Sequence, residues 1–284
     1  MSAAQVTAHR HARPSASGQV WTLFARAVAE RRRSLVVWAL GLGAIAAVQL
    51  SVYPSVRSSR EAMQAFVDQW PEAFREAFGL GAYASGPGYL NAELFSFVVP
   101  FVLIGVAIGA AAAATAGEEE RGTADLLLAL PVTRGTVLAA KTLVMVSGVA
   151  WVALLGWLVL ALGCPLVDLQ IDQRELAGAF TMAALLAVLF GASVLLVGAL
   201  SGSRALALGV GLGLALAAFL LDALAPMADW LRSWEQVSPF DWALGNEPLV
   251  NGADGGMALR FVVVAAFLLA LAHLAFRRRD VATR

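Results

Sequence analysis

The chain has very little reactive chemistry. Its 284 residues include one cysteine, Cys164, and three histidines, and only 14% of the residues are charged. A lone cysteine excludes an internal disulfide, and we interpret Cys164 as a small buried apolar residue. Two of the histidines, His9 and His11, precede the first apolar run, which leaves only His273 in an apolar run. Metal-dependent hydrolysis therefore lacks ligands, and we expect no metal site.

A phosphate-binding loop is also missing. Lys141, the only lysine, is followed by Thr142, but Ala140 stands where that motif requires glycine. We therefore expect no catalytic residue, no cofactor and no ATPase site in this chain, and we predict that it is not an enzyme. Lys141 itself is interpreted as an anchor at the membrane edge.

Apolar residues are abundant instead. They make up 60% of the chain, and the mean hydropathy is +0.74. Continuous apolar runs of about 20 residues predict membrane-spanning helices, because transmembrane strands would be shorter and would alternate. We predict an all-α membrane protein whose transmembrane domain covers residues 34–276, with six transmembrane helices over residues 35–53, 94–116, 142–162, 176–200, 205–225 and 257–276.

The basic residues lie mostly on one side of these six runs. By the positive-inside rule that side is cytoplasmic, and so are both termini. The net charge of zero hides this asymmetry, because most acids fall on the other side, in external segments 54–93 and 226–256 and between the third and fourth runs. The expected location is the cell (inner) membrane, with several passes.

The residues before the first run divide into two segments. Residues 1–18 have no apolar period and predict a disordered cytoplasmic tail. Residues 19–33 place apolar side chains at helical spacing before the Arg31-Arg32-Arg33 cluster, which predicts an amphipathic interfacial helix in the headgroup layer. No removable signal peptide is expected, and residues 277–284 form a basic cytoplasmic tail.

Two of the segments that connect the apolar runs have sequence patterns that predict their structure. In the first external segment, residues 61–78 predict an amphipathic helix that bends or restarts at Pro71. Its role is left open between a lid over a substrate exit and a helix resting on the outer leaflet. The fourth and fifth runs are separated only by residues 201–204, so we expect them to be antiparallel neighbours.

Ionisable residues within the runs are the next candidates for function, since burying them in a membrane is costly. The clear candidates are Asp222, near the outer end of the fifth run, and His273, near the inner end of the sixth, while Arg260, at the start of the sixth run, is assigned to the external side. Both candidates could reach an interface. A proton or ion relay through the core is therefore not expected.

The cytoplasmic loop of residues 117–141 is the most unusual segment. Acids at its start are followed by the apolar block Leu126 to Leu130, which stops at Pro131. Thr123 can cap a short helix, with Asp125 in its first turn. Such a helix is too short to be stable alone, so its leucines need a partner to pack against. Thr133 can cap the next helix.

At these residues the chain resembles the membrane subunits of ABC-2 type ABC transporters. Their second span is followed by a pair of glutamates, then Gly-Thr, a hydrophobic stretch and P-[VL]-[ST]-R. The matching residues are Glu119, Glu120, Gly122, Thr123, Leu126, Leu127, Pro131, Val132, Thr133 and Arg134. The six-span layout agrees as well, so the resemblance, which implies a type V exporter-like transmembrane domain, reaches most of the chain.

The resemblance implies that this loop holds a coupling helix that docks on a separate ABC ATP-binding subunit, which binds ATP and Mg²⁺. It also implies two ATP-binding subunits and a second permease copy, as a homodimer surrounded by membrane lipids, with no nucleic acid. The cargo implied is a hydrophobic or amphiphilic compound, such as a drug, natural product or lipid, that is exported. The residues implied in coupling are Glu118, Glu119, Glu120, Arg121, Gly122, Thr123, Asp125, Leu126, Leu127, Leu128, Leu130, Pro131 and Arg134.

Three other interpretations stay open. The chain could be a membrane scaffold or sensor that binds an ATPase without transporting anything. The loop could pack on the protein's own helices or rest on the membrane. An intramembrane hydrolase resembling CAAX-type proteases is the third, although Thr123 stands where their EExxxR motif has arginine.

Overall fold

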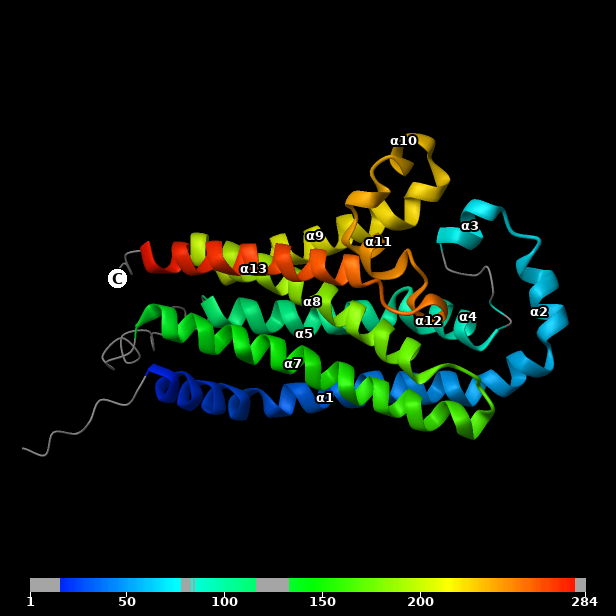
Figure 1. Ribbon diagram of the computed structural model, residues 1–284, viewed down its shortest axis with the longest axis horizontal. Coiled ribbons are helices and arrows are strands. Elements are labelled where there is room, and N and C mark those ends of the chain that lie inside the picture. Colours follow the sequence, from blue (N-terminus) through cyan, green and yellow to red (C-terminus); the bar gives the residue numbers. More distant parts are fainter. Residues whose placement is uncertain (1–15, 78–82, 84, 116–132, 279–284) are drawn as a thin grey trace, which may run out of the picture.

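The computed structural model describes residues 16–77, 83, 85–115 and 133–278 (Figure 1). Across these residues the secondary structure is helical, without strands. Six helices are long and apolar enough to cross a membrane, which confirms the predicted number. They cover Val20–Ser58, Gly86–Ala114, Gly135–Val167, Gln173–Ser201, Arg204–Met227 and Gly255–Arg277.

Two of the long helices form the centre of the bundle. These are α5 (Val98–Thr115) and α8 (Gln173–Ser201), which pack against each other along their length. Helix α7 (Arg134–Gly163) packs on both of them, and α1 (Ala16–Ser58) packs on α7. Helix α9 (Arg204–Leu224) packs on α8 and α5, and α13 (Gly255–Arg278) packs on α8. The outer helices α1, α9 and α13 keep wide apolar faces exposed, as expected of lipid-facing helices.

Small residues allow the central helices to approach closely. At Gly191 of α8, an added Cβ would lie 2.4 Å from Met145 Sδ of α7. At Gly211 of α9, it would lie 2.2 Å from Val194 Cγ2 of α8. Close backbone approach through glycine and alanine is the usual basis of helix packing in membranes, where lipid competes with any larger apolar contact.

The turn between α8 and α9 has the expected form. Gly202 ends α8 with φ 66°, a left-handed conformation that suits glycine, and the Ser203 hydroxyl then accepts a hydrogen bond from the backbone N–H of Leu206 at 3.3 Å. The two helices are antiparallel neighbours, as the short connection predicted.

Helix α1 differs from the expectation. We expected a separate interfacial helix over residues 19–33, but Ala16–Ser58 is one continuous helix that already begins inside the expected 1–18 tail. Half-buried positions near the start of α1 lie on the same side of the helix as fully buried positions further along. The half-buried ones are Val20, Phe24, Ala27, Val28 and Arg31, and the buried ones are Ala39, Leu42, Ala46 and Leu50. An apolar stripe alone does not say whether lipid or protein covers it, and here it continues the bundle-facing side.

The segment after α1 restarts at proline, as predicted. Helix α2 (Arg60–Val67) ends before Pro71, and α3 (Glu72–Ala77) begins directly after it. Helix α3 lies against the short helix η3 (Ala225–Met227) that follows α9. The chain then returns through α4 (Gly86–Leu90) and the π-helix η1 (Asn91–Phe95) into α5. The segment therefore crosses one end of the bundle (Figure 1).

Short helices fill the remaining connections at that end. Between α7 and α8 lies η2 (Cys164–Val167), and Cys164 is buried and free as expected. Between α9 and α13 lie η3, α10 (Asp229–Arg232), η4 (Glu235–Val237), α11 (Pro239–Leu244) and α12 (Pro248–Asn251). The buried Ser238 hydroxyl caps α11 by accepting from Phe240 N at 3.1 Å.

The opposite end carries the predicted cytoplasmic loop. The start of α1, the end of α5, the start of α7 and the end of α13 all lie there (Figure 1). We call it the loop end, because residues 116–132 connect α5 to α7 at this place.

Candidate functional site

Most of the predicted coupling residues lie outside the described part of the chain. This holds for Glu118 through Pro131, whereas Arg134 is the first residue of α7. The predicted cap is confirmed, because the Thr133 side chain accepts a hydrogen bond from Thr136 N at 3.2 Å. The structure therefore describes the two helices that bound the segment, and the site is built from them.

Two basic side chains bind the last turns of α5. The Lys141 ammonium donates a hydrogen bond to the backbone carbonyl of Ala114, and Arg31 Nη2 donates to the carbonyl of Gly109 at 2.9 Å. The carbonyl of Ala114 is in the last turn of α5 and has no partner within that helix, and the partial negative charge of a helix C-terminus favours cations. Lys141 was expected to be only a membrane-edge anchor, but it also joins α7 to α5.

Helix α7 is also held by α13. A Cβ added at Gly135, the second residue of α7, would lie 2.6 Å from Nε2 of His273. This contact places His273, one of the two intramembrane candidates, at the loop end beside the helix that follows the loop. The first turns of α7 thus contact both α5 and α13.

At the opposite end lies a polar cluster that the sequence did not suggest. The Glu93 carboxylate accepts hydrogen bonds from Tyr83 Oη at 2.7 Å and from Gln49 Nε2 at 3.0 Å. Tyr89 Oη donates to the backbone carbonyl of Gln49 at 3.0 Å, and its ring packs against those of Tyr83 and Tyr53. The cluster joins α1 to the segment that enters α5.

The local backbone explains how Glu93 reaches these partners. It lies in the π-helix η1, where one widened turn changes the direction of the side chains that follow. Burial, and then the hydrogen bond to Glu93, raise the pKa of the Tyr83 hydroxyl above its usual value. Tyr83 therefore stays protonated and donates its hydrogen bond.

The other intramembrane candidate, Asp222, belongs to a second polar group at this end. It lies near Asp241 and Glu235, next to the buried Ser238. Burial raises the pKa of Asp241, while Arg260 acts in the opposite direction. Arg260 also lies 5.1 Å from the ring centre of Trp242. Asp222 therefore lies near one end of the bundle, as expected, and not midway along it.

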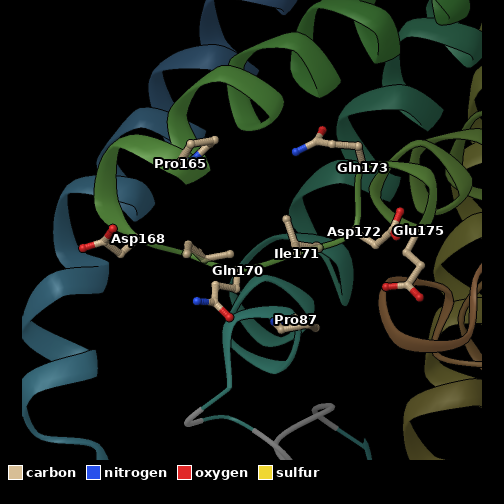
Figure 2. Close-up of a pocket in the computed structure, with 9 residues that line it drawn as sticks. Pro87, Pro165, Asp168, Gln170, Ile171, Asp172, Gln173 and Glu175 are labelled. Carbon is tan, nitrogen blue, oxygen red and sulfur yellow. The ribbon is translucent and has the colours of Figure 1, made fainter.

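A hollow of about 670 Å³ opens between α4, η2 and the start of α8 (Figure 2). Two of its three acids, Asp168 and Asp172, have structural partners. The Asp168 side chain turns toward α1, where it accepts from Arg57 Nη1 at 3.1 Å, and Asp172 caps α8 by accepting from Arg174 N at 2.6 Å. Among the described residues, no group of three or more histidines, cysteines or acids could hold a metal ion.

Phenylalanines gather where α5, α8, α9 and α11 meet. The ring of Phe219 lies 5.2 Å from Phe101 and 5.5 Å from both Phe97 and Phe240. Phe97 is 52% exposed, while Phe240 is fully buried. The cluster therefore extends from the core to the surface. It surrounds the end of α5 away from the loop with apolar, aromatic side chains.

The comparisons with known proteins agree with this architecture. Residues 21–281 match the family model described as ABC-2 family transporter protein. No curated protein matches the chain. Because the family match covers nearly the whole chain, including every long helix, the protein belongs to the ABC-2 transporter family, whose members are multi-pass membrane components of ABC transporters without an ATPase site of their own.

Proposed function

We propose that the chain is the permease subunit of an ABC exporter that moves a hydrophobic or amphiphilic compound out of the cell across the inner membrane. A separate subunit binds ATP and Mg²⁺ and docks at the loop end, which is cytoplasmic. The observation that carries the proposal is the position of residues 116–132. They connect α5, one of the two central helices, to α7, so a partner bound there would act directly on the centre of the bundle.

The composition of that segment supports docking on a protein. Leu126, Leu127, Leu128 and Leu130 form an apolar block between charged residues, and an apolar block in an aqueous loop needs a partner surface. On this proposal the leucines supply the apolar contact, while Glu118, Glu119, Glu120, Arg121 and Arg134 set its orientation through ion pairs.

The bundle itself favours an apolar cargo. From Val98 to Thr115, α5 carries no ionisable side chain. The phenylalanine cluster adds an aromatic surface at the end of α5 away from the loop. Strongly charged solutes would lose their hydration beside such helices without gaining partners, whereas lipids, drugs and natural products would not.

The proposed assembly is two permease copies on two ATP-binding subunits. The outer helices leave apolar faces available for a second copy as well as for lipid. On α9, Gly209 and Gly213 lie on one face, and apart from the adjacent backbone of α9 no atom of the described residues lies within 4 Å of a Cβ added at either of them. Such a face permits close helix packing between copies.

The test is a charge placed in the leucine block. Leu126→Glu and Leu127→Glu should abolish co-purification of the ATP-binding subunit, because a carboxylate cannot enter an apolar contact without loss of hydration. Membrane insertion should be unchanged. Leu166→Glu is the matched control, since Leu166 is 85% exposed at the opposite end of the bundle. Normal co-purification and ATPase stimulation in the Leu126 and Leu127 variants would disprove the proposed docking.

A further inference from the structure

The contact between Lys141 and Ala114 joins the two ends of the loop. Ala114 is the last residue but one of α5, and Lys141 lies about two turns into α7. The two residues are 27 positions apart in the sequence, and residues 116–132 lie between them. The hydrogen bond therefore closes the loop at its base and makes a direct link between the helix that enters it and the helix that leaves it.

The carbonyl of Ala114 has no partner of its own in α5. It is one of the last four carbonyls of that helix, and Ala114 is only 8% exposed, so water has little access to it. The ammonium satisfies the carbonyl and also opposes the negative end of the helix dipole. A neutral side chain at position 141 would remove the charge that opposes the dipole, and an apolar one would also remove this hydrogen bond to the carbonyl.

A lysine suits this place for a geometric reason. Lys141 is the only lysine in the chain, and the other basic residues of the chain are arginines and histidines. An ammonium is a compact charge on a flexible stem and can reach a single carbonyl at a helix end, and a guanidinium at the same position would keep the positive charge and the N–H donors. Arg31 reaches a carbonyl one turn deeper, at Gly109, so α5 is held from α1 as well as from α7.

We propose that Lys141 is a positioning residue for coupling, which holds the end of α5 and the start of α7 together so that a push on residues 116–132 moves both helices as one body. This inference rests on the proposed function. Without the link, the same push would separate the two helices at the base of the loop and would be lost there. Because Gly135 packs tightly against His273, the moving start of α7 would also displace α13.

The test uses the whole complex of permease and ATP-binding subunits in membrane vesicles. Cys164→Ala removes the one native thiol, and Ser96→Cys places a reporter at a half-buried position just before α5, at the end away from the loop. The measured quantity is the rate at which a membrane-impermeant maleimide modifies this cysteine, with no nucleotide and with ATP plus vanadate. Lys141→Met is compared with Lys141→Arg, which keeps the charge and the donors.

With native Lys141, nucleotide should change the modification rate several-fold. The Lys141→Met complex should still assemble and hydrolyse ATP, but the change should disappear, and Lys141→Arg should restore it. If Lys141 acted only on the stability of the protein, its replacement would not abolish the change in modification rate at position 96 while leaving ATP hydrolysis intact. Should Lys141→Met fail to reach the membrane, Lys141→Gln replaces it, with the same expected loss.

An equal nucleotide-driven change in the Lys141→Met or Lys141→Gln complex would overturn the inference and leave the proposed function intact. A chain with native Lys141 that binds no ATP-binding subunit would overturn the proposed function itself. The two failures are therefore distinguishable.

Discussion

Gly135 and His273 are in such close contact that no side chain fits between them. A Cβ at Gly135 would lie 2.6 Å from Nε2 and 3.1 Å from Cε1 of His273. Gly135 belongs to the first turn of α7 and His273 to the last turns of α13, so the contact fixes the spacing of these helices at the loop end. The glycine is thus required by packing and not by backbone conformation.

The first prediction is that Gly135→Ala destabilises the protein by about 1–3 kcal/mol, the usual range for overpacking a tight contact. The midpoint of thermal unfolding in detergent would measure it. The matched control is Gly209→Ala, because in the described part of the chain only the adjacent backbone of α9 lies within 4 Å of a Cβ at Gly209. This control should be neutral, or stabilising by up to about 1 kcal/mol through helix propensity.

The cause can be tested within the same contact. His273→Ala removes the imidazole that an alanine at position 135 would meet, so the double variant should recover most of the stability lost in Gly135→Ala. Additive losses in the double variant would contradict the steric explanation.

The second prediction concerns the polar cluster at the other end. Tyr83→Phe removes the hydrogen bond of 2.7 Å to the Glu93 carboxylate and should cost about 1.5–3 kcal/mol, the range for a hydrogen bond to a charged group. Tyr53→Phe is the control, because the ring of Tyr53 packs against Tyr89 while its hydroxyl has no hydrogen-bond partner among the described residues. Chemical denaturation followed by tryptophan fluorescence would compare them, and equal losses would argue against a special role for Glu93.

The third prediction is a pH dependence from Asp241. Burial raises the pKa of Asp241 in the folded protein, against the opposing effect of Arg260. The folded state then holds this proton more tightly than the unfolded state. Its contribution to stability is fully present below the unfolded pKa and is lost as the pH rises through the folded pKa.

Asp241→Asn should remove that contribution. The midpoint of thermal unfolding, measured from about pH 4 to about pH 8, should therefore decline less with rising pH in the variant than in the native protein. A steeper decline in the variant would mean that the attraction of Arg260 outweighs the burial of Asp241.

Much of the fold could be predicted because its signals are local. Six apolar runs give six long helices, Pro71 separates α2 from α3, and Thr133 caps α7. The turn at Gly202 and Ser203 needed only a short polar connection between two apolar runs. In each case the deciding residues are close in the sequence.

The remainder depends on residues far apart in the chain. The apolar stripe of α1 could face lipid or protein, and only the bundle decides between them. Glu93 meets Gln49 from 44 positions away, and Lys141 meets Ala114 from 27 positions away, so no local pattern indicates either pair. For the proposed coupling site, the sequence predicts the segment between α5 and α7, and the structure adds the contacts of the helices that bound it.

The most direct test of the whole account is purification of the tagged chain from its native membrane under mild detergent, followed by identification of the bound proteins and an assay of ATP hydrolysis. The account predicts that an ATP-binding subunit co-purifies, that the complex hydrolyses ATP, and that Leu126→Glu removes both while Leu166→Glu removes neither. A chain that is purified alone and without ATPase activity from native membranes would contradict the account.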